Sequence, residues 1–324
     1  MADAGPLPQT ASDAGMGRHP GTAQAPPSAP APLFIPGHRL PPSPDGDRRL
    51  RRATTLVGAA IVLLVVLGLA LLSTATWLAG RGFTAVPAIS ELGSPAALTL
   101  TSGIGTVRVL PSGDVDELTL ALVAPGATTL PAADAQVPAR VTQTTGADRT
   151  TVEVRQPTRS FSPPWSDGTR DVLLLVPTGL ELALAVHTDV GDVLVDGDLL
   201  SLDAHSTAGD LRLGPLSAPD GVSATTEAGN IDLELDSPAP ATIELAAGVG
   251  DVDLLLPTDA AGQVSITTDL GDVEVAVPGT ARWQIRAESQ LGEVHTAPGL
   301  SDGAGEAVGT LTVDSELGTI DITR

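Results

Sequence analysis

The sequence predicts an all-β protein, specifically a β-solenoid with coils of about 20 residues. In the last part of the chain, a glycine followed by a polar residue and then an aliphatic residue recurs at intervals of 18, 20, 21, 21, 21 and 26 residues. On both sides of each glycine, apolar residues alternate with polar ones, which is the period of a half-buried strand. The copies are Gly191-Asp192-Val193, Gly209-Asp210-Leu211, Gly229-Asn230-Ile231, Gly250-Asp251-Val252, Gly271-Asp272-Val273, Gly292-Glu293-Val294 and Gly318-Thr319-Ile320.

Two strands are predicted in each coil, one on each side of the glycine. Counted from the glycine, positions +2 and +4 are mostly aliphatic, such as Val273 and Val275, and so are positions −7 and −5, such as Val264 and Ile266. We therefore expect the glycine to form a corner, where freedom at positive φ is useful. A β-sandwich of hairpins would give the same alternation. The constancy of glycine, acid and aliphatic residue at one offset favours the solenoid.

One stretch of the repeats resembles a known family. The run VPTGLELALAVHTDVGDVLVDGDLLSLDAHSTAGDLRL, from Val176 to Leu213, is similar to the bacterial "putative adhesin" domains, whose coils carry a Ser/Thr-rich strand, a Gly-Asp corner and an aliphatic strand. The resemblance covers residues 171–324 and implies a β-solenoid in a membrane-anchored surface protein, with no catalytic residues. The chain departs from the family pattern where Gly299 to Glu306 inserts a glycine-rich loop.

Composition limits the classes of function. The chain is 42% hydrophobic but only 2% aromatic, so its core must consist mainly of Val, Leu, Ile and Ala. It contains no cysteine, which excludes disulfides, cysteine nucleophiles and thiolate metal sites. The net charge of −22 opposes binding to phosphate backbones, so we expect no nucleic-acid partner. Such a surface suits cations or cationic polymers, or serves only to keep the protein soluble.

The N-terminal part predicts a single-pass membrane anchor. Residues 1–52 are rich in Pro and Ala and are expected to be a disordered tail. Residues 53–80 carry no charge and are long enough for a transmembrane signal anchor. Four arginines precede this segment, at 48, 49, 51 and 52, whereas only Arg81 follows it closely. The positive-inside rule therefore places the N-terminus in the cytoplasm and the β-domain outside the bacterial plasma membrane.

Three regions are expected after the anchor. Residues 81–95 form a stalk, residues 96–176 a membrane-proximal β region that covers one end of the solenoid, and residues 177–324 the solenoid repeats. Gly105, Val107 and Val109 also fit the repeat template.

The recurring carboxylates are the main candidate for a cation site. Oxygen-rich rows suit calcium, but the GGxGxD nonapeptide of calcium-binding β-rolls is missing and exposed carboxylates at this spacing repel only weakly. Calcium binding is thus possible but not favoured over a solvated ladder. The carboxylates are Asp189, Glu227, Asp269 and Glu316 at position −2, with Asp192, Asp210, Asp251 and Asp272 at position +1.

Other candidates do not form a recognisable site. His187 and His205 both stand at position −4 and are expected to be neighbours on stacked coils, but no third metal ligand accompanies them. Phe161 and Trp165, within residues 159–168, could stack on a sugar, although plugging the end of the solenoid is the favoured role.

An enzyme is not favoured, so no catalytic, cofactor-binding or metal-binding residues are predicted. The acids recur with the repeat, whereas a catalytic pair should be a local exception. Arg212, Arg282 and Arg286, the arginines that a polysaccharide-cleaving enzyme would need, form no cluster.

The sequence therefore predicts a non-enzymatic, membrane-anchored binding or adhesion-like protein with an unknown surface or envelope ligand. The alternative is an envelope-stress sensor that signals through its cytoplasmic tail. The chain stops at Arg324, directly after a strand in which Ile320 and Ile322 should point inward. We expect weak self-association through this uncovered C-terminal coil, unless the insertion from Gly299 to Glu306 folds over it.

Overall fold

The computed structural model describes residues 58, 62–63, 65–68, 83–157, 169–302 and 305–324. The chain divides into two units, Met1–Val65 and Val66–Arg324, and the second contains all the described strands. Residues 58, 62–63 and 65–68 are helical, but no helix among the described residues is both long and apolar enough to cross a membrane. The predicted tail and most of the predicted span, residues 53–80, lie outside the described residues.

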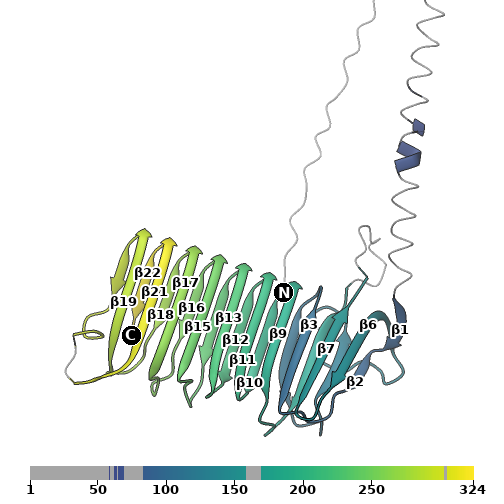
Figure 1. Ribbon diagram of the computed structural model, residues 1–324, viewed down its shortest axis with the longest axis horizontal. Helices are drawn as coiled ribbons and strands as arrows, with labels where there is room; N and C mark the ends of the chain where they lie inside the picture. The colour runs from purple at the N-terminus through teal and green to yellow at the C-terminus, as the bar shows by residue number, and fades with distance from the viewer. Residues whose placement is uncertain (1–57, 59–61, 64, 69–82, 158–168, 303–304) are drawn as a thin grey trace, which may run out of the picture. The chain divides into compact units, whose positions relative to one another are not determined.

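The described strands form two sheets of eleven strands each (Figure 1). The first sheet contains, in spatial order, β1 (Thr84–Pro87), β6 (Gln136–Thr145), β7 (Arg149–Arg155), β3 (Ala97–Ser102), β9 (Ala183–Val190), β11 (Ser201–Ala208), β13 (Gly221–Ala228), β15 (Thr242–Val249), β17 (Gly262–Leu270), β21 (Ala307–Leu317) and β19 (Arg282–Leu291). The second contains β2 (Ile89–Glu91), β5 (Thr119–Val123), β8 (Asp171–Pro177), β4 (Val107–Ser112), β10 (Val193–Asp198), β12 (Leu211–Ser217), β14 (Ile231–Leu235), β16 (Val252–Leu255), β18 (Val273–Ala276), β22 (Ile320–Thr323) and β20 (Val294–Thr296).

From β8 onward the chain alternates between the sheets, so that each coil gives one strand to each of them. Within a sheet, strands of neighbouring coils pair in parallel and in register: Val252 pairs with Val273, and Ile243 with Val264. Residues at the same offset from the glycine therefore stack into columns. This arrangement confirms the predicted coils of two strands, and it contradicts the alternative sandwich of hairpins, which needs antiparallel neighbours.

The core lies between the two sheets and is aliphatic. Positions −7 and −5 face positions +2 and +4 across it, and in the coil of β15 and β16 all four side chains, Ile243, Leu245, Val252 and Leu254, are at most 2% exposed. Removing one such side chain from water stabilises the fold by about 1.5–3 kcal/mol. The columns join these contributions into one core that runs through the stacked coils.

The corners require glycine for two physical reasons. Gly209, Gly229 and Gly250 have φ values of 151°, 148° and 149°, which other residues rarely adopt. In addition, a Cβ on Gly250 would overlap the carbonyl oxygen of Gly229, the corner glycine of the preceding coil. The corner backbones thus approach one another more closely than any side chain allows.

Gly250→Ala is expected to lower the free energy of unfolding by about 2–4 kcal/mol, because the methyl group must displace the Gly229 carbonyl and the residue must keep a strained φ. Thermal denaturation should show a melting temperature lower by roughly 5–10 °C. Gly113→Ala is the control, because no atom lies within 4 Å of its Cβ and its φ is not positive. Equal losses in both variants would contradict the steric account.

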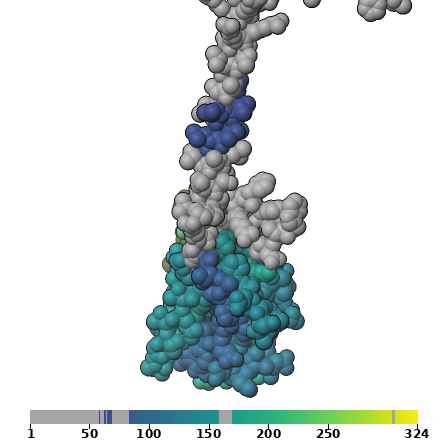
Figure 2. Space-filling model, turned by 90° about the vertical axis from the view of Figure 1, so that its right-hand side faces the viewer, coloured from purple at the N-terminus to yellow at the C-terminus, as the bar shows by residue number. Residues whose placement is uncertain are grey.

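Antiparallel strands close the N-terminal end of the solenoid. β1 pairs with β6 and β2 pairs with β5, and these strands add to the edges of β7 and β8. Figure 2 faces this end, where the blue and teal residues of the closing strands form the surface. Residues 84–91, expected to belong to a stalk, therefore form edge strands of the two sheets instead. β8 is buried along most of its length because Leu173 and Leu175 also pack under a second small cluster that includes Val115 and Ala127.

The spatial order of the coils differs from their sequence order at both ends. β3 and β4 lie between β7–β8 and β9–β10, and Val107 pairs with Val193, which stands at the same position of its own coil. At the other end, β21 and β22 insert between β17–β18 and β19–β20. Ile320 and Ile322 do point inward and are fully buried. However, the expectation that the final coil is uncovered is wrong, since β20 pairs with β22 on its outer side.

The glycine-rich insertion makes this exchange possible. The wide interval after Gly292 gives the chain enough length to pass back over β19 and β20, so that β21 and β22 can pair with β17 and β18. The ring of Trp283 is 1% exposed and lies against Gly309 of β21, which has no side chain to exclude it. The insertion is fixed by the buried Leu300 and by Arg282, whose guanidinium donates to the carbonyl oxygens of Ser301 at 3.0 Å and Gly305 at 2.9 Å.

Candidate functional site

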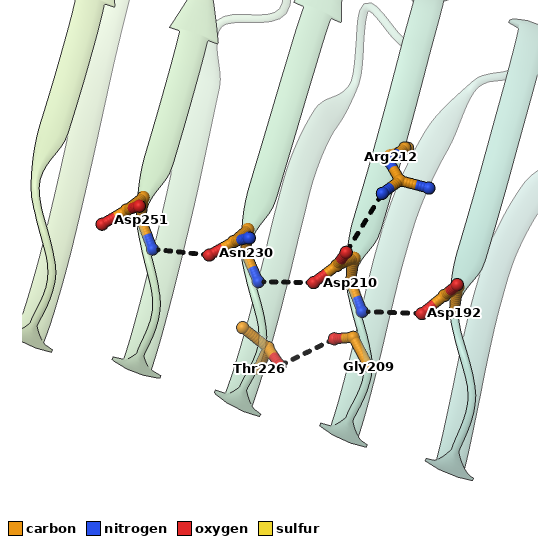
Figure 3. A network of polar contacts seen from close by, with 7 residues as sticks. All are labelled: Asp192, Gly209, Asp210, Arg212, Thr226, Asn230 and Asp251. Carbon is orange, nitrogen blue, oxygen red and sulfur yellow. Dashed lines mark hydrogen bonds and ion pairs between the residues drawn. The ribbon is translucent and has the colours of Figure 1, made fainter.

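The polar residues that follow the corner glycines form a hydrogen-bonded ladder (Figure 3). In each step the side-chain Oδ1 of one coil accepts a hydrogen bond from the backbone N–H of the next coil. The steps run from Asp210 N to Asp192 at 3.1 Å, Asn230 N to Asp210 at 3.0 Å, Asp251 N to Asn230 at 2.9 Å, Asp272 N to Asp251 at 2.9 Å and Thr319 N to Asp272 at 2.6 Å. The last step spans 47 residues of sequence, because β22 and not β20 follows β18. These side-chain oxygens therefore accept the hydrogen bonds of the backbone N–H groups at the corners.

A second ladder lies on the inner side of the corners, at position −3. Ser206 Oγ donates to the carbonyl of Gly191 at 3.3 Å, and Thr226 Oγ1 donates to that of Gly209 at 3.2 Å. The Thr226 contact is visible in Figure 3. Both hydroxyls belong to buried residues, so their hydrogen bonds avoid the cost of an unpaired polar group. Ser206 and Thr226 thus hold their corners from inside while the carboxylates hold them from outside, whereas the hydroxyls of Thr188 and Ser315, at the same position, are buried with no hydrogen-bond partner among the described residues.

The described residues do not build a metal site at these corners. No group of three or more His, Cys, Asp or Glu side chains in the described ranges could hold an ion. His187 and His205 are neighbours on stacked coils, as predicted, with ring centroids 6.0 Å apart and planes at 55°. Their column continues with Thr101 on one side and Thr225 on the other, neither of which is a usual zinc ligand. The loop with Phe161 and Trp165 lies outside the described residues.

A separate row of carboxylates lies on the outer face of the second sheet, at position +3. Asp232, Asp253, Glu274 and Asp321 follow one another in register across β14, β16, β18 and β22. Asp253, Glu274 and Asp321 border a shallow hollow of about 320 Å³. The pKa of Asp253 is raised, first by partial burial and then by the negative charges of Glu274, Asp232 and Asp251.

This raised pKa makes stability depend on pH. The folded protein holds the Asp253 proton more tightly than the unfolded chain, so ionising Asp253 costs stability. The cost is absent below the ordinary pKa of 3.8, grows as the pH rises through the folded-state pKa and is complete above it.

Asp253→Asn is therefore expected to raise the melting temperature at neutral pH by about 1–2 °C, which corresponds to about 0.5 kcal/mol after allowing for solvent screening. The gain should vanish below about pH 3.5, where the carboxyl is protonated in both states. Asp220→Asn, an exposed carboxylate in a turn, serves as the control and should change little. A gain of the same size at both pH values would show that charge is not the cause.

The described carboxyls with a raised pKa do not form a catalytic pair. The pKa of Asp196 is raised by partial burial, an effect that Arg108 opposes. Asp196 lies on β10 and Asp253 on β16, with β12 and β14 between them. An acid and base that act on one bond must lie much closer. Among the arginines considered above, Arg282 fixes the insertion and Arg212 bonds to Asp210 at 3.1 Å, so both have structural partners.

An exposed aliphatic column runs along the corners at position −1. We name these residues the corner ridge: Val190, Ala208, Ala228, Val249, Leu270, Leu317 and Leu291, in spatial order. The larger side chains are well exposed, with values of 54% for Val190 and Val249, 47% for Leu270 and Leu317 and 70% for Leu291. An aligned row of exposed aliphatic residues is unusual on a soluble surface and typical of an interaction site.

Carboxylates flank the corner ridge on both sides. Position −2 carries the exposed Asp189, Glu227, Asp269 and Glu316, and position +1 carries the ladder described above. The predicted corner acids are thus brought together, but around an apolar row that the sequence prediction missed. A signal was present, because five of the seven repeats have Val or Leu directly before the glycine. The surface offers apolar contact together with negative charge, which suits a ligand with apolar and cationic groups.

A larger hollow of about 740 Å³ lies beside the N-terminal closing strands. Its polar lining consists of Glu91, Asp114, Asp116, Glu117 and Thr119. No imidazole or cationic group is among its lining residues, so it lacks the mixed acid and base groups of most hydrolytic sites.

Comparisons with known proteins give a fold likeness only. No family model matches the chain, and no curated protein matches it. A crystal structure of a "putative cell adhesion protein" from Clostridium sporogenes is similar at 13% identity, covering 74% of this chain and 99% of that one, with a TM-score of 0.34. A "putative adhesin" from Bacteroides fragilis is similar at 13% identity, covering 74% and 97%, with a TM-score of 0.44.

Proposed function

We propose that this chain is a non-enzymatic, adhesion-like binding protein, anchored in a bacterial plasma membrane, which binds its partner along the corner ridge. The observation that carries the proposal is the row of exposed Val and Leu side chains between two rows of carboxylates. Burying this row against a partner would release the water that now covers it, at about 25 cal/mol for each Å² of apolar surface.

The geometry of the corner ridge favours an extended partner. Its seven residues lie on successive rungs about 4.8 Å apart, so the row is about 30 Å long. A flat row of this length fits a chain that lies along it better than a small molecule that needs a concave pocket. The flanking carboxylates favour cationic groups in the partner, and the overall charge of −22 would attract such a partner from a distance.

The arrangement of the acids supports binding instead of catalysis. Those at position +1 are engaged with backbone amides, and those at position +3 repeat along the sheet without a distinct local pair. The membrane anchor rests on the charge-free segment 53–80 and the arginines before it. The same sequence features motivate the alternative, a sensor that signals through residues 1–52.

The corner ridge is tested with the purified full chain and an extended peptide of alternating Leu and Lys. The double variant Leu270→Ser/Leu317→Ser is expected to bind this peptide at least about fivefold more weakly, because it removes two adjacent large apolar contacts. Surface plasmon resonance on immobilised protein measures the change.

Leu255→Ser is the matched control, since Leu255 is 43% exposed but lies on the outer face of the second sheet, away from the corner ridge. It should bind like the wild type. A peptide of alternating Leu and Glu should not bind. Equal binding of both peptides, or equal loss in both variants, would overturn the proposed surface.

The proposed orientation is tested by adding protease to intact, wall-stripped cells. The region after Arg81 is expected to be digested while the N-terminal tail stays protected, because the arginines hold the tail inside. Protection of the β-domain would overturn the orientation. Deleting residues 1–47 separates the two functions, since adhesion should survive the deletion whereas tail-dependent signalling should not.

A further inference from the structure

The solenoid has an open end at the coil formed by β19 and β20. Each of these strands has a neighbour on one side only among the described strands. Val294 occupies core position +2 but is 41% exposed, whereas Val252, Val273 and Ile320 at the same position are at most 1% exposed. Ile285 at position −7 is likewise only partly buried. The apolar column therefore stops without a cover at this end.

The opposite end is protected against pairing. Its edge strand in the first sheet, β1, has four residues and ends in Pro87, which has no N–H to donate. Its edge strand in the second sheet, β2, has only three residues. In contrast, β19 has ten residues and contains no proline, and its sequence is RWQIRAESQL. Short strands and prolines are the usual means of blocking an edge, and β19 has neither.

The backbone of β19 fixes which residues can pair outward. In a parallel ladder, successive residues of a strand direct their N–H and C=O groups alternately to the two sides. The carbonyl of Leu291 accepts from Gly318 N–H at 3.2 Å, so the odd-numbered residues face β21. The even-numbered residues, Gln284, Arg286, Glu288 and Gln290, therefore direct their backbone groups outward.

The charges of these residues select one register for pairing with a second copy. An antiparallel pair about a two-fold axis must bring even-numbered residues opposite one another. Centred on Arg286 or on Glu288, it would place like charges opposite each other, which is destabilising. Centred on Ala287, it places Arg286 opposite Glu288 of the second copy, twice by symmetry, and Gln284 opposite its Gln290. The ion pairs formed by the described residues include neither Arg286 nor Glu288, so both are available.

We propose that two copies of this chain associate end to end through β19, paired antiparallel about a two-fold axis at Ala287. The axis runs perpendicular to the two stacked sheets, so it also brings β20 beside its copy. The pair would extend both sheets across the junction and cover Ile285 and Val294. Self-association was expected from the sequence at the C-terminal strand, and the exchanged coil order moves it to β19 and β20.

The inference deepens the proposed adhesion-like function by naming a partner, a second copy of this chain. It rests on the proposed function only where the paired copies are taken to join two cells. The surface shares only Leu291 with the corner ridge, so the two can fail separately. Leu270→Ser/Leu317→Ser should leave self-association unchanged.

Charge exchange in the full chain provides the first test, with the dimerisation constant measured in mild detergent by analytical ultracentrifugation. Arg286→Glu and Glu288→Arg should each weaken association at least about tenfold, because each places like charges opposite one another at two symmetric positions. The double variant Arg286→Glu/Glu288→Arg restores both pairs and should associate within about threefold of the wild type.

Glu244→Arg is the matched control, because it makes the same change of charge on the outer face of the interior strand β15 and should have no effect. Restoration in the double variant would show that the single variants fail through lost pairing and not through misfolding. A wild-type chain that stays monomeric, or single variants that associate normally, would overturn the proposal.

Cross-linking tests the register directly, because the chain has no cysteine of its own. Ala287→Cys should form a disulfide with its own copy, since opposed residues lie about 4.5–5.5 Å apart. A mixture of Arg286→Cys and Glu288→Cys should form mainly the mixed disulfide, because identical residues at these positions lie about 7–8 Å apart. Equal amounts of mixed and self disulfides would exclude the proposed register.

Discussion

The close approach of successive corner backbones is the constraint on which the rest of this fold depends. Each corner carbonyl occupies the space that a side chain of the next corner would need, so glycine must recur once in each coil. Once the corners are stacked at this distance, the strands on either side are fixed in register. Columns of like residues then follow, including the buried aliphatics, the Ser/Thr hydroxyls and the carboxylates that accept hydrogen bonds from the next corner.

The repeat made the coil predictable but not the order of the coils. Offsets from the glycine correctly assigned both strands of a coil and their inward positions, including Val107 and Val109. Yet every coil follows the same template, so periodicity cannot say which of two coils lies on a given neighbour. The exchanged positions of β3–β4 and β21–β22 depend on connection length and on single contacts, such as Trp283 against Gly309. A template shared by all coils contains no information of that kind.

The candidate site was only partly predictable for a related reason. The acids at the corners were recognised, and they do lie together, but their hydrogen bonds to backbone amides follow from distances that a sequence does not contain. The aliphatic residue before the glycine has the parity of a core position, yet the chain turns there and leaves Leu270 and Leu317 about half exposed. Alternation alone cannot separate a buried residue from one that the corner turns outward.

The exchanged coils at the C-terminus also impose an order of assembly. A chain synthesised as far as residue 296 already holds β19 and β20, and the exposed edges of β17 and β18 offer them a neighbour with the same template. The coil that belongs on those edges, β21 and β22, is made last. The two segments thus compete for the edge of β17 and β18. β19 and β20 must either remain unpaired with this edge or be displaced from it before β21 and β22 can pair there. This solenoid therefore cannot be completed by adding its coils in the order of the sequence.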